Sequence, residues 1–230
     1  MALTDKLTAI ANAIRTKTGS TDTMTLAEMA TAISNIQTGS VQEPYIEETY
    51  DGNGNLTDVK LHGYTKIRNC AFYDCSNLAL TSLPSEITSI GISAFYECSN
   101  LALTSLPGGL TSINEYTFRG CSKLALTSLP SGITSIGKQA FYSCSSLALS
   151  SLPSGITSIG DSAFEHCHGI SSLTFEGKPS SIGRTAFYGC INLKTINVPW
   201  AEGEVAGAPW GATNATINYN YTPPTTEATA

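Results

Sequence analysis

The amino-acid sequence predicts a mainly β solenoid, built from stacked coils of 23 residues and preceded by a small helical module and a β-hairpin. The main observation is a repeat in which a cysteine follows each phenylalanine by three positions. Its members recur every 23 residues, as Phe72, Phe95, Phe118, Phe141, Phe164 and Phe187 and as Cys75, Cys98, Cys121, Cys144, Cys167 and Cys190. A fixed period of this length is typical of a solenoid, in which each unit forms one turn.

A single repeat has too little apolar surface to fold alone. One coil carries about eight apolar side chains, each worth roughly 1.5 to 3 kcal/mol when fully buried. Ordering the backbone costs about 1 to 2 kcal/mol for every residue of the coil. We therefore expect the coils to stack and to share a continuous core and ladders of backbone hydrogen bonds.

A β-hairpin is expected before the first coil, because residues 45–67 alternate between polar and apolar side chains around the turn Asp51-Gly-Asn-Gly-Asn55. The same turn resembles the start of a calcium-binding loop. Such a loop needs glycine at its sixth position and glutamate at its twelfth, where this chain has Leu56 and His62. The sequence therefore favours a hairpin that caps the solenoid.

Two short amphipathic helices are predicted at the N-terminus, where apolar residues follow helical spacing. These residues form a candidate attachment face: Leu3, Leu7, Ile10, Ile14, Leu26, Met29, Ile33 and Ile36. Two helices of this length are marginal alone, so their apolar faces need each other, the solenoid or another chain. The spacing is compatible with a homo-trimer through the helices.

The chain is accordingly divided into five segments. They are an attachment module at 1–39, a linker and hairpin cap at 40–67, the solenoid at 68–199, a C-terminal cap at 200–221 and a flexible tail at 222–230. Trp200 and Trp210 fall in the C-terminal cap, where their rings are expected to cover the last coil and not to contact a ligand.

The composition excludes some classes of partner. Charged residues make up 13% of the chain, the net charge is -6 and the pI is near 5.0. These values disfavour nucleic acid and anionic membrane surfaces. No run of apolar residues has the length of a membrane span or of the centre of a signal peptide. We expect a soluble protein that does not insert into membranes and is not exported by the general secretory route.

Six of the seven cysteines share one register of the repeat, so stacking places them in one column. Adjacent strands are about 4.8 Å apart, and parallel side chains keep that separation at Cβ, whereas a disulfide prefers about 3.5 to 4.5 Å. Free, buried thiols are therefore predicted, which is compatible with synthesis in a reducing cytoplasm. Cys70 is out of register and is expected to be exposed.

No part of the sequence combines the side chains of a catalytic site. The histidines do not pair with a recurring acid and nucleophile, and no glycine-rich phosphate loop joins a strand to a helix. His166 and His168 flank Cys167, but a core-facing Cys167 would leave two diverging surface histidines and no fourth zinc ligand. We expect no enzyme activity, no cofactor and no bound metal.

A variable position follows each phenylalanine and should form a stripe along one flank of the stacked coils. Its residues are Tyr73, Tyr96, Arg119, Tyr142, Glu165 and Tyr188. Aromatic rings beside polar groups can stack on sugars or anchor an interface, which makes this stripe the candidate ligand site. The alternative is that the rings pack over the edge of the core and only their hydroxyl groups meet water.

The repeat consensus Leu-x-Leu-x-x-Leu-Pro-x-x-Ile-x-x-Ile-Gly-x-x-Ala-Phe-x-x-Cys resembles the BspA-like class of leucine-rich repeats over residues 65–199. One full copy runs from Leu78 to Cys98, while the third unit departs from the consensus at Gly108-Gly109 and from Asn114 to Thr117. The resemblance implies a curved leucine-rich-repeat solenoid with little helix and a role in adhesion and surface recognition.

The flanks resemble proteins of a more specific setting. The opening Leu-Thr-Ala-Ile-Ala-Asn-Ala-Ile-Arg-Thr-Lys-Thr-Gly-Ser is similar to short N-terminal modules of tail-associated proteins from phages and prophages of gut bacteria. The closing Val-Pro-Trp-Ala-Glu-Gly-Glu-Val-Ala-Gly-Ala-Pro-Trp-Gly-Ala is similar to C-terminal segments of leucine-rich-repeat proteins in the same setting. This resemblance implies a fibre or appendage protein of the phage virion.

Two functions follow as hypotheses. In the first, the chain is a non-enzymatic structural protein of the phage particle, made in the host cytoplasm. Its helices attach it to other virion proteins, and its solenoid contacts a glycan or protein of the host surface. In the second, it is a cell-surface or secreted bacterial adhesin of the same repeat class. The adhesin predicts an export signal or wall anchor, and because neither was found the virion protein is the first hypothesis.

Overall fold

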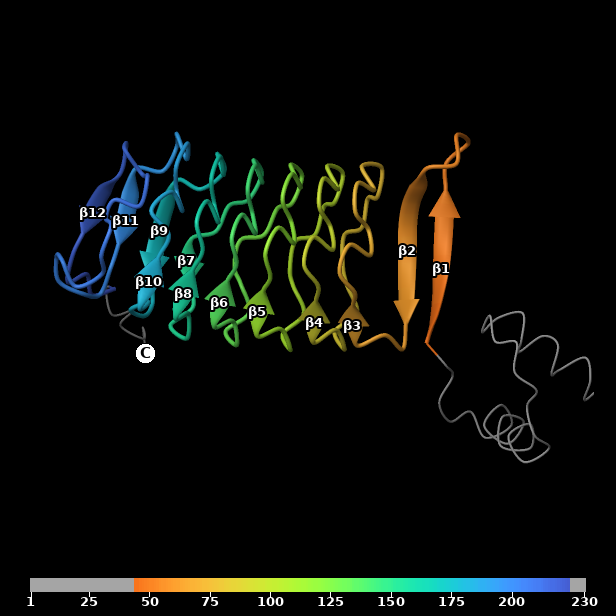
Figure 1. The fold of residues 1–230 in the computed structure, drawn as a ribbon, viewed down its shortest axis with the longest axis horizontal. Helices are drawn as coiled ribbons and strands as arrows, with labels where there is room; N and C mark the ends of the chain where they lie inside the picture. Colours follow the sequence, from red (N-terminus) through yellow and green to blue (C-terminus); the bar gives the residue numbers. More distant parts are fainter. Residues whose placement is uncertain (1–43, 224–230) are drawn as a thin grey trace, which may run out of the picture. The chain divides into compact units, whose positions relative to one another are not determined.

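The computed structural model describes residues 44–223, while residues 1–43 and 224–230 lie outside the described part. All regular elements between residues 44 and 223 are β strands. Figure 1 shows the coils side by side along the long axis of this unit, with the hairpin of β1 and β2 at one end and β12 at the other. The predicted mainly β solenoid of 23-residue coils is confirmed. The predicted helices and their attachment face lie outside the described residues.

The hairpin joins β1 (Tyr45–Tyr50) to β2 (Leu56–His62) in antiparallel register, with one bulge near the turn. The carboxylate of Asp51 organises the turn. One of its oxygens accepts from the backbone N–H groups of Asn53 and Asn55, at 2.8 and 2.9 Å, and the other accepts from Asn55 Nδ2 at 2.9 Å. These hydrogen bonds occupy the carboxylate, so it serves the predicted hairpin turn.

Two rows of short strands run along the solenoid. The first row contains β3 (Lys66–Ile67), β4 (Ser89–Ile90), β5 (Ser112–Ile113), β6 (Ser135–Ile136), β8 (Ser158–Ile159) and β10 (Ser181–Ile182). The second row contains β7 (Ser151–Leu152), β9 (Ser172–Phe175), β11 (Thr195–Asn197) and β12 (Thr216–Asn218). Paired strands within these rows are parallel. In the first row isoleucine aligns with isoleucine, and serine aligns with serine, as between β6 and β8, except that Lys66 of β3 aligns with Ser89 of β4.

The phenylalanines of the repeat form a buried column through the middle of the solenoid. Neighbouring rings are nearly parallel, and their centroids are 5.2 to 5.6 Å apart. All six rings are buried. The backbone keeps the same register, because the N–H of Phe141 donates to the carbonyl of Ala163 in the next coil at 2.8 Å. Each coil therefore buries the apolar side chains of its neighbours, as stacking requires.

The cysteines form a second column, in which the thiols are free and hydrogen-bonded. From the second coil onward each thiol donates to the phenylalanine carbonyl of the preceding coil, as Cys144 does to Phe118 at 2.9 Å. Cys121, Cys167 and Cys190 make the same bond at 3.0 Å. Cys70 is exposed. The cysteines are free as predicted, and they are buried from Cys98 onward, whereas Cys75 in the first coil is half-buried. The thiol adds a hydrogen bond that links consecutive coils.

One seam interrupts the first row of strands, because β4 and β5 belong to different sheets. Most coils have glycine after the row-one isoleucine, and its N–H bonds the preceding coil, as Gly137 N–H does with Ile113 O at 2.8 Å. A Cβ atom on Gly137 would lie 2.6 Å from a backbone nitrogen of that coil. The third coil has Asn114 here, and its side-chain Nδ2 donates to Ile90 O at 2.6 Å instead. A side-chain amide thus replaces a backbone donor at the seam.

The segment after Pro199 adds a further coil that closes the core. Strand β12 pairs in parallel with β11, and the carbonyl of Trp210 accepts from the N–H of Phe187 at 2.9 Å. The rings of Trp200 and Trp210 are both buried and lie 6.5 Å apart, each against Phe175. The tryptophan rings therefore pack on Phe175, whose ring in turn contacts Phe187, the last phenylalanine of the column, with centroids 6.3 Å apart.

Candidate functional site

The flank stripe is positioned by two left-handed residues in most coils. In the fourth coil these are Gln139, with φ of 51°, and Ser143, with φ of 57°. The chain turns sharply at each of them. Between the turns, Phe141 points into the core and is fully buried, while Tyr142 is half-buried on the flank. Non-glycine residues seldom adopt this conformation, so the repeated bonds between coils must hold it.

Tyrosines begin the stripe at the hairpin end. The rings of Tyr73 and Tyr96 are stacked with centroids 4.6 Å apart and an angle of 4° between their planes. Partial burial and the neighbouring hydroxyl of Tyr96 raise the pKa of the Tyr73 hydroxyl above its ordinary value. Tyr73 is still 50% exposed, because its second face has no ring from a preceding coil.

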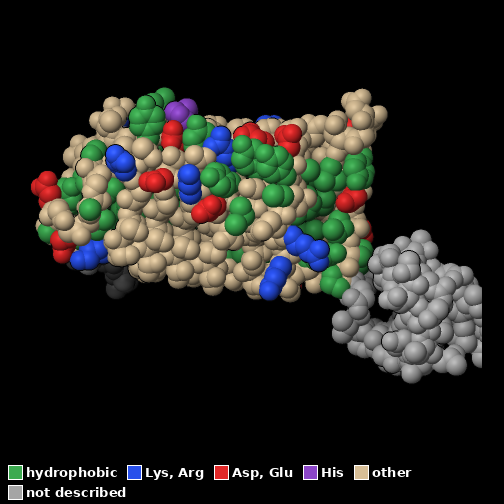
Figure 2. Space-filling model, in the orientation of Figure 1, with side chains coloured by type: hydrophobic (Ala, Val, Ile, Leu, Met, Phe, Trp, Pro, Cys, Tyr) green, Lys and Arg blue, Asp and Glu red, His purple; other side chains and the backbone are tan. Residues whose placement is uncertain are grey.

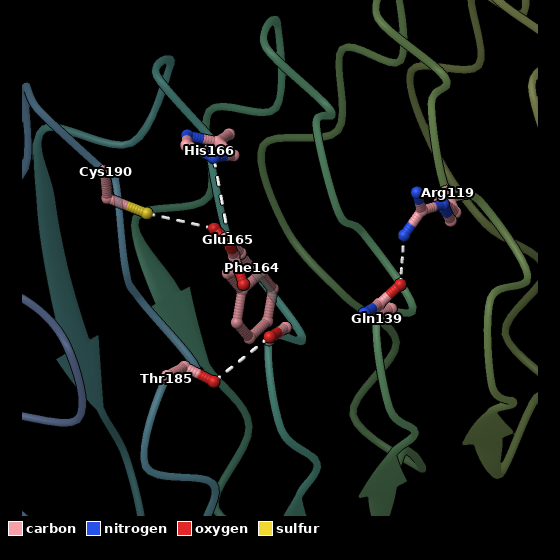
Figure 3. A network of polar contacts seen from close by, with 8 residues as sticks. Arg119, Gln139, Phe164, Glu165, His166, Thr185 and Cys190 are labelled. Carbon is pink, nitrogen blue, oxygen red and sulfur yellow. Dashed lines mark hydrogen bonds and ion pairs between the residues drawn. The ribbon is translucent and has the colours of Figure 1, made fainter.

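Arg119 occupies the middle of the stripe, between two tyrosines. Its Cζ atom lies 4.2 Å from the ring centroid of Tyr142 and 5.5 Å from that of Tyr96. Its Nε donates to the Tyr96 hydroxyl at 3.2 Å, and Nη1 donates to Oε1 of Gln139. Figure 3 shows the guanidinium directed toward Gln139 of the adjacent coil. Cation–π contact and hydrogen bonds therefore fix the guanidinium in one orientation.

Glu165 and Tyr188 complete the stripe. The ring of His166 lies between the rings of Tyr142 and Tyr188 and close to the carboxylate of Glu165. His166 Nε2 lies 3.7 Å from a carboxylate oxygen of Glu165. The imidazole presents its edge to Tyr142 at 5.7 Å and to Tyr188 at 6.0 Å between centroids. Tyr188 is 50% exposed, as Tyr73 is. Figure 3 shows His166 beside Glu165. The imidazole thus continues the aromatic series at the coil in which the stripe position holds a carboxylate.

The structure brings all six predicted stripe residues to one flank in the order of their coils. Where the series stacks, between Tyr73 and Tyr142, ring faces meet a neighbouring ring or a guanidinium. The remaining surface is made of ring edges and hydroxyl groups, with the outer part of Tyr73 at one end and of Tyr188 at the other. Such a surface suits hydrogen bonding along its length and ring stacking at its ends.

Two members of this site do not follow from the repeat position alone. Gln139 belongs to the row two places before each phenylalanine, and His166 to the row two places after it. Both rows vary from coil to coil, which is the signal that could have identified them as surface rows near the stripe. Their contacts with Arg119 and with the tyrosines depend on side-chain lengths, which the period does not specify.

The thiols do not provide a reactive site. Burial raises the pKa of Cys98 to about 12 and that of Cys190 to about 11. For the fully buried Cys144, burial likewise raises the pKa well above the ordinary value. A nucleophilic or metal-binding cysteine needs its thiolate form at neutral pH, so this column serves packing.

Metal-binding geometry is lacking in the part of the chain that the structure describes. No group of three His, Cys, Asp or Glu side chains between residues 44 and 223 is arranged to hold an ion. Cys167 is buried in its column, while His166 and His168 are partly exposed beside it.

At the turn between β1 and β2, the hydrogen bonds to Asp51, led by those from Asn55, lower the pKa of its carboxyl group.

The surface of the described residues includes a groove at the hairpin end and a broad polar face. The groove, of about 730 Å³, lies between β2 and residues 79–86 of the first coil. The Thr-Ser pairs 81–82, 104–105 and 127–128 are exposed. Figure 2 shows a wide area of uncharged polar surface beside scattered acidic and basic side chains. Within the described residues, no helix is long and apolar enough to cross a membrane.

Comparison with known proteins agrees with the fold of the solenoid. The family model described as "BspA type Leucine rich repeat region" matches in six copies, over residues 45–171 and 134–202. No sequence among the curated proteins matches the chain.

Two solved structures share the fold. A leucine-rich repeat protein from Bacteroides ovatus is 26% identical, with a TM-score of 0.54 over 68% of this chain. The leucine-rich repeat protein of T. pallidum is also 26% identical, with a TM-score of 0.51 over 67% of this chain and 82% of its own. The match spans 46% of the Bacteroides ovatus chain. Since the family model covers more than half of the sequence, the chain belongs to the BspA-type leucine-rich repeat family.

Proposed function

We propose that this chain is a non-enzymatic adhesion protein, whose solenoid presents the flank stripe to glycans of a cell surface. The observation that carries the proposal is the continuous series of aromatic and hydrogen-bonding side chains from Tyr73 to Tyr188. Tyrosine and arginine are the side chains that most often dominate recognition surfaces. The coils that carry these side chains are firmly connected, because hydrogen bonds from backbone N–H groups and from thiols join each coil to the next.

A glycan fits this surface better than a large hydrophobic partner does. The stripe residues between its ends are half-buried, and the outward groups are mainly hydroxyls, amides and ring edges. Sugars use hydrogen bonds to such groups together with stacking on an exposed ring. A periodic surface also matches a ligand that is itself repetitive, since several coils can then contact several sugar units at once.

Binding of the full chain to a printed array of neutral and acidic bacterial surface glycans tests the proposal. We expect at least one class of glycan to be retained. The Tyr96→Ala/Tyr142→Ala double variant should lose that binding while its circular dichroism spectrum stays unchanged. The matched control is Thr104→Ala/Thr127→Ala, which alters the exposed hydroxyl face and should bind as the original chain does. Equal binding by both double variants would exclude the stripe.

The setting of this adhesion protein is a separate part of the proposal. The resemblance of the flanks to phage tail-associated proteins supports a virion appendage, in which the N-terminal segment attaches the solenoid to other virion proteins. The alternative is a bacterial cell-surface or secreted adhesin, which the repeat family supports equally. Electron microscopy of gently purified phage particles, labelled with an antibody against the solenoid, distinguishes them. Label on particles is expected for the virion protein, and label on bacteria for the adhesin.

A further inference from the structure

The guanidinium of Arg119 is the one cationic centre within the stripe, and its geometry is unusual for a surface arginine. It forms no ion pair among the described residues, where the ion pairs are made by other side chains. Its position is nevertheless fixed by Tyr96, Tyr142 and Gln139. The side chain is therefore already ordered before a ligand binds, so binding loses less conformational entropy, as in a preorganised binding site.

The contacts that hold Arg119 leave part of its hydrogen-bonding capacity unused. A guanidinium has five N–H donors in a planar fork. Within the described residues, Nε bonds the Tyr96 hydroxyl and Nη1 bonds Gln139, so both hydrogens of Nη2 and one of Nη1 have no partner. A planar pair of N–H donors matches the two oxygens of a carboxylate.

The surroundings select for a ligand with a single negative charge. Asp74, Glu97 and Glu165 lie on the same flank, and the carboxylate of Glu97 lies over Gly120, the residue that follows Arg119. The chain as a whole has a net charge of -6. These carboxylates repel a polyanion such as a sulfated polysaccharide or an acidic peptide. A neutral, hydroxylated molecule with one carboxylate can bind the guanidinium with much less of this electrostatic repulsion.

An exposed ring lies within reach of the same ligand. Tyr73 is two coils from Arg119, about 10 Å away at the spacing of stacked strands, and half of its surface is open. A short oligosaccharide spans this distance. It can place its carboxylate at the guanidinium and the apolar face of another sugar on Tyr73.

Resting on the proposed glycan adhesion, we propose that Arg119, clamped between Tyr96 and Tyr142, binds the carboxylate of an acidic sugar, a sialic or uronic acid. Gln139 and Tyr96 act as positioning residues, because they orient the guanidinium through its Nη1 and Nε atoms. Recognition is then selective for glycans with isolated carboxylates over neutral glycans of the same size.

Isothermal titration of the full chain with sialyllactose, cellobiouronic acid, lactose and a tetraglutamate peptide tests this assignment, because each of the two acidic sugars has one carboxylate. We expect at least one of the two acidic sugars to bind roughly tenfold or more tightly than lactose, the effect of one charged hydrogen-bonded contact. The Arg119→Gln variant should lose this preference. Arg119→Lys should keep only part of it, because a lysine retains the charge but not the fork. The control Arg184→Gln removes an exposed cation elsewhere and should bind as the original chain does.

The outcomes separate the two proposals. Equal binding of acidic and neutral sugars, or an acidic preference that survives in Arg119→Gln, overturns the arginine assignment and leaves glycan adhesion standing. Arg119-dependent binding of the peptide without binding of the sugars overturns the ligand class. If neither sugars nor array glycans bind at all, the proposed function and this inference both fail. Unfolding midpoints of each variant establish that the folded protein is being compared.

Discussion

Two columns of side chains run along the solenoid one residue apart, and they differ in how far their members vary. The buried column repeats phenylalanine in all six coils with nearly even ring spacing. The flank column contains Tyr, Arg and Glu, and its contacts change from stacking to cation–π to edge contacts. A core position has neighbours on every side, whereas a flank position faces water on one side. The difference teaches that this fold can vary the side chains of its surface without changing its core.

Among the changes considered, alkaline pH should lower the stability of the solenoid most, through the buried cysteine column. Burial raises the pKa of the column thiols, to about 12 for Cys98 and about 11 for Cys190, whereas the unfolded value is near 9.0. The unfolded chain therefore loses these protons first as the pH rises. The stabilisation is complete below about pH 9, declines by about 1.4 kcal/mol per pH unit for each of these thiols above it, and is lost once the pH passes the folded pKa.

Urea unfolding at about pH 8, 9 and 10 measures this decline. The midpoint should stay nearly constant up to about pH 9 and then fall. The Cys70→Ser variant should follow the same curve, since Cys70 is exposed. A midpoint that does not change across this range would show that the thiol column does not contribute in this way.

Trp210→Ala tests whether the buried column needs its terminal cover. The ring is fully buried and lies against Phe175 and Trp200. Its removal should lower the unfolding free energy by roughly 3 to 5 kcal/mol, the usual cost of truncating a large core aromatic residue. Trp210→Phe should recover part of this loss. If urea unfolding gives the same stability for all three proteins, the last coil does not close the core.

The seam at Asn114 provides a comparison within the first row of strands. Asn114→Ala removes the donor to the Ile90 carbonyl and should cost about 1 to 3 kcal/mol. Asn114→Gly restores the residue of most other coils and should allow the backbone bond seen at Gly137, so its cost should be smaller. Equilibrium unfolding of the two variants measures the difference. Identical losses would contradict the role of the side-chain amide.

Cys144→Ala should give the smallest of these effects. The thiol fills a buried site and bonds Phe118 O, but the same carbonyl also accepts from the N–H of Cys121 at 3.1 Å. We expect a loss of roughly 1 to 2 kcal/mol, mainly from packing. Urea unfolding beside Cys70→Ala, the exposed control, checks it. A loss no greater than that of the control would mean that the column tolerates a missing sulfur atom.

The repeat and the hairpin could be predicted because their signals are local and periodic. The spacing of Phe72 and Cys75 through the coils determines both columns, and the turn after Tyr50 has the residues that a hairpin needs. The order of the stripe residues follows from the same period. These features require only that equivalent positions stack on equivalent positions.

Other features depend on contacts between positions that are not equivalent. The placement of His166 between Tyr142 and Tyr188 requires a side chain from a neighbouring row. In the hydrogen bond from Asn114 to Ile90, a side-chain amide takes the place of the backbone N–H that the consensus glycine provides in other coils. Left-handed conformations at residues such as Gln139 also have no glycine to indicate them. A period specifies which residues align, but not how unlike side chains fill the space between them.

The most direct test of the division between support and recognition compares Phe141→Ala with Tyr142→Ala, which change adjacent residues of the same coil. Urea unfolding should give a loss of roughly 3 to 5 kcal/mol for Phe141→Ala and of about 1 kcal/mol for Tyr142→Ala, which loses one cation–π contact. On the same glycan array, Tyr142→Ala should bind much more weakly than the original chain. Equal losses of stability, together with unchanged glycan binding by Tyr142→Ala, would contradict the account.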